Sequence, residues 1–163
     1  MFNQFKSFLS VTTLMLIIFS SQSIAEKAPD FSLEGDNGRI NLADFKNKVV
    51  YVDFWASWCK PCRKSFPFMN EMEKKYGKRG LKIIAINLDS DTGAAKSFLK
   101  KNKADFTIAY DPDGKTPDKY KLRVMPTSYL IDKNGNIQNV HKGFKEEQRK
   151  ELENKIVKLL NKR

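Results

Sequence analysis

Histidine and cysteine are scarce in this chain. Its 163 residues include one histidine and two cysteines. A closed zinc site needs four ligands, so these three side chains could form one only with carboxylate help, and we expect no metal. The chain also lacks internal repeats and low-complexity tracts. Its length therefore favours one domain with a sizeable hydrophobic core.

Acidic residues are outnumbered by basic ones. The chain has 30 Lys and Arg against 19 Asp and Glu, a net charge of +11. Such a balance can indicate an anionic partner, such as nucleic acid or a membrane surface. However, the lysines are spread along the chain, and no arginine-rich arm or RNA-binding signature is present. We expect no nucleic-acid partner, while weak attraction to an acidic partner stays open.

No apolar run reaches the length of a typical membrane span. The apolar segment 8–19 follows Lys6 and is short for a bilayer. Small residues at 23–25 suit a signal peptidase, so residues 1–25 predict a secretory signal peptide, with an uncleaved membrane anchor as the alternative. Its removal takes away one lysine and no acid, which lowers the net charge from +11 to +10. We expect a periplasmic or otherwise extracytoplasmic protein whose residues 26–163 form one domain.

The two cysteines, Cys59 and Cys62, lie three positions apart, directly after an apolar run. Outside the cytosol such a pair tends to oxidise, so it could be a structural staple, an oxidant or a reductant recharged from elsewhere. A staple that closes so short a loop would constrain the unfolded chain little. The spacing therefore favours thiol–disulfide exchange, in which a thiolate attacks and a second sulfur resolves the mixed disulfide.

Hydrophobic periodicity predicts alternating strands and helices. After a hairpin over residues 31–41, strands are expected at residues 49–55, 81–88, 106–110, 127–131 and 137–141. A helix is expected at 61–76, with a kink at Pro67, and a second one follows a capping segment at 89–91. A short helix is expected at 116–120. The last helix is expected at the C-terminus, with one apolar face formed by Leu152, Ile156, Leu159 and Leu160. This order predicts an α/β fold with a central mixed sheet flanked by helices.

The predicted strand-to-helix junction assigns roles to the cysteines. Cys59 would lie at a helix N-terminus, where free backbone N–H groups stabilise a thiolate and lower the thiol pKa to about 3.5–7.5. Cys62 would lie one turn deeper on the same face and act as the resolving cysteine. Lys60 would either favour the thiolate further or be an ordinary exposed lysine.

Asp53 is the other unusual residue, because it interrupts a buried apolar strand. Desolvation should raise its pKa, so that it can take and return a proton while Cys62 is deprotonated. The alternative is a strand-end aspartate that reaches water or a lysine. Trp58 and Met125 could form an apolar rim for a substrate peptide, or simply pack. We expect His141 on a strand surface rather than in the catalytic machinery.

Together these residues resemble the thioredoxin superfamily, in particular its exported TlpA/ResA-like branch. Residues 52–62 are similar to the active-site signature, and Met125-Pro126-Thr127 to the cis-proline loop. Further likeness to that branch covers residues 28–31, 42–49, 89–120 and 129–135. The resemblance implies a thioredoxin-like domain over residues 26–163, with an N-terminal β-hairpin extension and a helix–strand insert.

The resemblance also implies function. The bond before Pro126 would be cis, and Trp58, Met125, Pro126 and Thr127 would contact an extended substrate. The implied activity is reduction of cysteine-containing proteins outside the cytoplasm, often in cytochrome c maturation, with electrons from a membrane thiol reductant. We expect a monomer with no cofactor beyond the redox-active Cys59–Cys62 disulfide. The chain departs from that branch at three points: Asp53, which is more like general thioredoxin, Ser65-Phe66 before the helix proline, and the lack of the acidic groove segment of cytochrome-maturation members.

Three other functions remain open. A DsbA-type thiol oxidase usually carries a large helical insertion, and the insert here is short. A peroxiredoxin shares the pattern at residues 28–31 but places its cysteine after a Pro/Thr-rich turn, which residues 58–62 do not match. A binding module with a purely structural disulfide is the non-enzymatic alternative.

Overall fold

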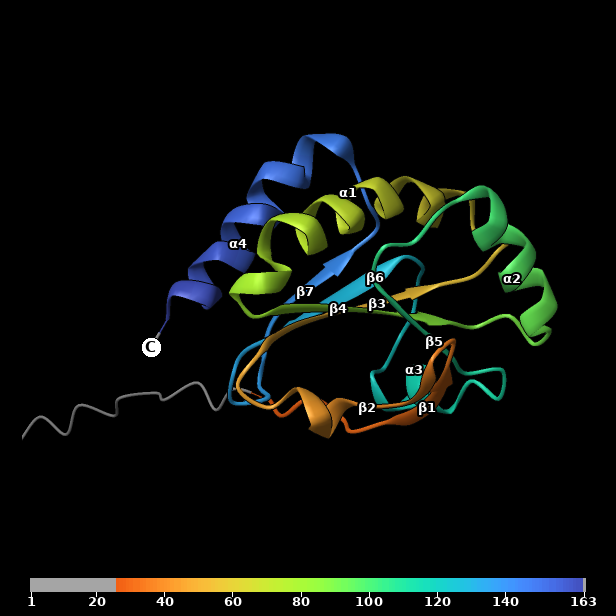
Figure 1. Ribbon diagram of the computed structural model, residues 1–163, viewed down its shortest axis with the longest axis horizontal. Helices are drawn as coiled ribbons and strands as arrows, with labels where there is room; N and C mark the ends of the chain where they lie inside the picture. Colours follow the sequence, from red (N-terminus) through yellow and green to blue (C-terminus); the bar gives the residue numbers. More distant parts are fainter. Residues whose placement is uncertain (1–25, 163) are drawn as a thin grey trace, which may run out of the picture.

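A seven-stranded mixed sheet forms the centre of the computed structural model, which describes residues 26–162 (Figure 1). The predicted signal peptide or anchor, residues 1–25, lies outside the described residues. The strand order is β2-β1-β5-β4-β3-β6-β7. The strands are β1 Ser32–Gly35, β2 Gly38–Asn41, β3 Val49–Trp55, β4 Leu81–Asn87, β5 Thr107–Tyr110, β6 Thr127–Ile131 and β7 Ile137–Lys142. β4 runs parallel to β3 and β5, and the remaining pairs are antiparallel, which confirms the predicted mixed sheet.

Helices cover both faces of this sheet. They are α1 Lys60–Tyr76, α2 Thr92–Lys101, α3 Lys115–Lys119 and α4 Arg149–Asn161, with short 3-10 turns at Leu42–Phe45, Gly77–Arg79 and Glu146–Gln148. Figure 1 shows α1 and α4 together on one face and α3 on the other. None of the helices within residues 26–162 combines the length and apolar character needed to cross a membrane.

The alternation of side chains along β3 divides the core into two layers. Tyr51 and Trp55 belong to the apolar cluster that packs under α1 and α4, whereas Val50, Val52 and Phe54 belong to the cluster on the opposite face. Successive strand residues point to opposite faces, so a strand with helices on both sides is apolar on both. This explains why the run 49–55 is almost continuously hydrophobic and why Asp53 stands out within it.

The N-terminal hairpin is part of the central sheet, rather than an appendage beside it. β1 pairs with β5 through Glu34 opposite Tyr110 and Gly35 opposite Ala109. A Cβ at Gly35 would lie 2.8 Å from the Ile108 carbonyl oxygen, so the close approach of the two strands requires glycine here. The sequence predicts the hairpin itself but not this pairing, because the partners are far apart in the chain.

Helix α1, which carries both cysteines, is held on the sheet by an aromatic cluster. The ring of Phe66 lies 5.1 Å from Trp55, 5.3 Å from Phe98 and 5.4 Å from Phe106, centroid to centroid. These partners come from β3, α2 and the segment before β5, so one side chain joins the insert to the central sheet. The helix continues through Pro67, where we expected a kink.

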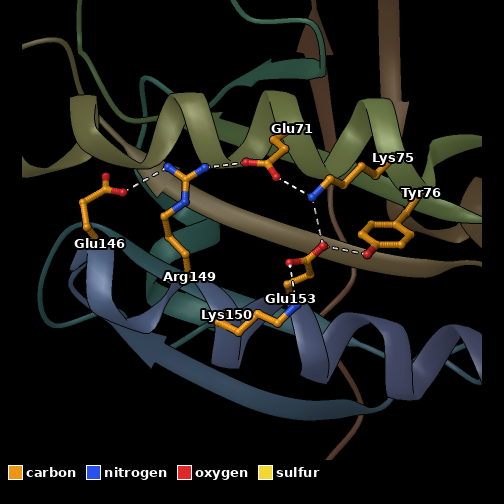
Figure 2. A network of polar contacts seen from close by, with 7 residues as sticks. All are labelled: Glu71, Lys75, Tyr76, Glu146, Arg149, Lys150 and Glu153. Atoms are coloured by element: carbon orange, nitrogen blue, oxygen red, sulfur yellow. Dashed lines mark hydrogen bonds and ion pairs between the residues drawn. The ribbon is translucent and has the colours of Figure 1, made fainter.

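A polar network joins α1 to α4 along their exposed edge (Figure 2). Glu71 accepts hydrogen bonds from Lys75 and from Arg149, and Glu153 accepts them from Lys75 at 3.2 Å and from the Tyr76 hydroxyl at 2.7 Å. The hydrogen bonds from Lys75 and Arg149 hold the pKa of Glu71 below its usual value. Since its members are exposed or only partly buried, the network orients the two helices more than it stabilises them.

Candidate active site

The cysteines lie at the N-terminus of α1, at the point where β3 ends. Cys59 is the N-cap residue and is disulfide-bonded to Cys62, with Cα atoms 5.4 Å apart. The backbone N–H of Cys62 donates to the Cys59 sulfur at 3.3 Å. Cys59 is 5% exposed and Cys62 fully buried, so an approaching substrate reaches Cys59 first. The predicted placement at a helix start and the deeper position of Cys62 are both confirmed.

Asp53 is buried within β3, the strand that leads to these cysteines. It is 2% exposed, and its Oδ2 has no hydrogen-bond partner among the described residues. Burial raises the pKa of its carboxyl well above the usual value. Strand alternation puts Asp53 on the same face as Tyr51 and Trp55, which is the face that α1 covers. The pKa of Tyr51 is raised too, by its own burial first and then by the charge of Asp53. The alternative of a strand-end aspartate in contact with water or lysine is wrong.

A proline loop lies next to the cysteines. The Met125–Pro126 peptide bond is cis, as the resemblance implies. A pocket of about 590 Å³ separates this loop from the start of α1, and its lining comprises Trp58, Cys59, Lys60, Pro61, Leu122, Arg123, Val124 and Met125. Trp58 and Met125 therefore line a common pocket with Cys59, as the rim hypothesis requires.

Thr127 and Pro126 have a different place from the one we expected. Both are buried and neither lines the pocket. The Thr127 hydroxyl donates to the Val124 carbonyl oxygen at 2.8 Å, and the Pro126 carbonyl accepts from Gly143 N at 2.8 Å. These bonds shape the loop, so any contact of Thr127 with a substrate would pass through its backbone.

His141 lies away from the cysteines. It pairs with Ser128, which pairs in turn with Asp53, so two strand spacings separate the histidine from the aspartate. Burial, and then the charge of Lys155, lower the pKa of His141. This placement agrees with the interpretation of His141 as a residue outside the catalytic machinery.

Known proteins share both the sequence and the fold. The Redoxin family profile matches residues 24–156. The chain belongs to the Redoxin family. It is 39% identical over 137 residues to the thiol-disulfide oxidoreductase ResA of Bacillus thuringiensis, which covers 83% of this chain and 78% of that protein. ResA of Bacillus subtilis is 36% identical over 138 residues, 83% of this chain and 77% of the relative.

A solved structure extends the match of this Redoxin-family chain to three dimensions. A crystal structure described as the thiol:disulfide interchange protein DsbE of Chlorobium tepidum superposes with a TM-score of 0.83 at 49% identity, and covers 84% of this chain and 97% of the other. The predicted thioredoxin superfamily, the thioredoxin-like fold and the enzyme class, a thiol–disulfide oxidoreductase, are thereby confirmed.

Asp89 of this Redoxin-family chain has a role other than the predicted helix cap. The helix cap expected from residues 89–91 is Asp91 alone, whose carboxylate accepts from Gly93 N at 2.8 Å. Asp89 is instead buried and accepts from Ser57 N at 2.9 Å and from the Ser57 hydroxyl at 3.0 Å. The Asn87 amide donates to it at 2.8 Å. Asp89 thereby fixes the turn that presents Trp58 and Cys59.

A signal for Asp89 does exist in the sequence. Ser57 and Asp89 come just after two predicted buried strands, and each lies two residues beyond the end of its strand in the structure. The carboxyl ends of adjacent parallel strands meet at one edge of a sheet, where loop residues come together. What the sequence does not specify is that these two strands are neighbours.

The described residues hold no group of three or more His, Cys, Asp or Glu placed to bind a metal ion.

Proposed function

We propose that this protein is an exported protein-disulfide reductase in which Cys59 is the nucleophile and Cys62 the resolving cysteine. The observation that carries the proposal is the geometry of the Cys59 sulfur. This sulfur lies beside a peptide-sized pocket and accepts from the Cys62 N–H at the start of a helix. The helix N-terminus and this N–H both favour a thiolate once the disulfide is reduced.

The reaction moves two electrons from the dithiol to the substrate. The Cys59 thiolate attacks one sulfur of a substrate disulfide, which forms a mixed disulfide and releases the other substrate sulfur as a thiolate. Cys62 then loses its proton and attacks the Cys59 sulfur, and the second substrate thiolate leaves. The product is the Cys59–Cys62 disulfide that the structure contains.

Asp53 is the base for the second step. Its carboxyl is buried on the face that α1 covers, and burial raises its pKa well above the usual value. A base of this kind can accept the Cys62 proton and return it to the leaving thiolate, whereas an ordinary exposed aspartate is too weak. Cys62 is itself fully buried, so it needs an internal proton acceptor.

The substrates are cysteine-containing proteins, and cytochrome c haem-site cysteines are one such class. Reducing equivalents come from a membrane thiol reductant, since the pair would otherwise remain oxidised outside the cytosol. Residues 1–25 carry the export signal, which is either cleaved or kept as an anchor. The protein works as a monomer without a further cofactor.

A trapping experiment tests this function. The Cys62→Ala variant should accumulate substrates as mixed disulfides on Cys59, whereas Cys59→Ser should trap none and lose disulfide reduction. Undiminished reduction by Cys59→Ser would overturn the proposal. The reduction potential gives the direction of electron flow, because a strongly oxidising value near that of DsbA, about −120 mV, would identify an oxidase instead.

A further inference from the structure

The surface beside Cys59 exposes two large apolar side chains on opposite sides of one pocket. Trp58 is 69% exposed and Val124 is 50% exposed. Only one other large apolar side chain within residues 26–162, Val140, is similarly exposed. Trp58 precedes the attacking cysteine, and Val124 precedes Met125 in the proline loop, so an extended segment lying in the pocket would touch both.

The charged residues of this pocket are all cations. Lys60 and Arg123 line it, and no carboxylate does. Neither cation forms an ion pair within the described part of the chain. Elsewhere on the surface lysines do find carboxylates, as Lys115 does with Asp113 at 2.8 Å. The pocket therefore offers two positive charges, one from the start of α1 and one from the segment before the proline.

We propose that this pocket selects disulfide-bearing segments in which an acidic residue lies within two positions of the cysteine and an apolar residue lies next to it. The inference rests on the proposed function and names its substrate class. An extended chain advances about 3.3 Å per residue, so two positions span about 7 Å, which a lysine or arginine side chain can cover. A basic segment would meet like charges, and this repulsion adds to the selectivity.

The expected preference follows from the exposure of the two cations. An ion pair at a solvent-exposed site changes an equilibrium by about 1.4- to 5-fold. Two such pairs, with the matching repulsion of basic segments, predict a preference of about tenfold for acidic over basic flanks at low salt. Because these charges face solvent, we expect the preference to shrink to about twofold near 0.5 M salt.

Three disulfide-linked peptides test the proposal. The peptides differ only at the second position before and the second position after the cysteine. Both positions carry Glu in the first peptide, Gln in the second and Lys in the third. The measurement is the second-order rate constant for their reduction by the full exported chain, which is reduced beforehand with dithiothreitol that is then removed, at 20 mM and 500 mM NaCl. The expected order is Glu, then Gln, then Lys. The variants Lys60→Gln and Arg123→Gln should each reduce the Glu-to-Lys ratio about threefold.

Lys74→Gln is the matched control. Lys74 is an exposed lysine of the same helix, 14 positions after Lys60 and hence about 21 Å along the axis. It should leave the ratio unchanged. Equal rates for the three peptides, or an equal effect of the Lys74 and Lys60 variants, would overturn the selectivity. Bis(2-hydroxyethyl) disulfide, which carries no charge, separates the two failures. If the protein reduces it but shows no preference among the peptides, only this inference fails. If the protein does not reduce it, the proposed function fails as well.

Discussion

Replacing Asp53 by asparagine should make the protein more stable at neutral pH and less active. Burial raises the folded-state pKa of Asp53 well above its usual value of 3.8. Above about pH 4 the unfolded chain therefore releases this proton while the native state keeps it. The native state binds more protons across that window, so the free energy of unfolding falls as pH rises. Asparagine does not titrate and removes this loss.

The size of the gain follows from the surroundings of the carboxyl. Its Oδ2 has no partner among residues 26–162, and the side chain is 2% exposed. A buried polar group without a partner costs about 1–3 kcal/mol, a cost that asparagine keeps, whereas a buried charge without a partner costs more, and asparagine removes that excess. We expect Asp53→Asn to be more stable by about 1–3 kcal/mol at pH 8, which corresponds to about 3–10 °C in Tm for a chain of this size.

Activity should change in the opposite direction. A positioned proton-transfer group contributes about 10²- to 10⁴-fold, and water can replace part of it, so we expect the resolution step to slow at least tenfold. Single-turnover reduction of a protein disulfide measures this step. Urea unfolding of the oxidised proteins between pH 4 and pH 9 measures the stability difference and its pH dependence.

Asp118→Asn is the control, because Asp118 is an exposed aspartate of α3. Its unfolding curve should follow that of the wild type at every pH. A constant difference between wild type and Asp53→Asn across the pH range would refute the raised pKa. An unchanged resolution rate with the expected stability gain would refute the proton role alone.

Three further substitutions test other parts of the structure. Asp89→Ala removes three charge-assisted hydrogen bonds to Ser57 and Asn87 and should cost about 2–4 kcal/mol in urea unfolding, so a loss below about 0.5 kcal/mol would contradict the turn-fixing role. His141→Gln should make stability less sensitive to acid, because burial lowers the folded-state pKa of His141 below its usual value of 6.5. The unfolded chain therefore takes up a proton first as pH falls, and the wild type, but not the variant, loses stability below about pH 6.5. Parallel pH profiles would refute this. Phe66→Ala should cost about 3–5 kcal/mol by thermal or urea unfolding, since its ring contacts three aromatic partners, and a cost near zero would mean that the cluster repacks.

Local patterns in the sequence determine most of the secondary structure and the redox pair. The apolar run 49–55 predicts β3, and the bounds agree with the structure. The four apolar residues of the last helix are buried as expected. Cys59 and Cys62 are recognisable because their spacing and the strand before them are properties of neighbouring residues. Such features depend on contacts within a few positions, which periodicity reports directly.

The tertiary structure alone decided which distant residues meet. It brought Asp89 to Ser57, added the hairpin to the sheet through Gly35 and β5, and turned the Thr127 side chain away from the pocket. Each outcome depends on which strands are neighbours and on how the loops beyond them cross. Strand order depends on many contacts between residues far apart in the chain, so no short stretch of sequence specifies it. The placement of the CxxC pair depends only on the strand and the helix start next to it in the sequence.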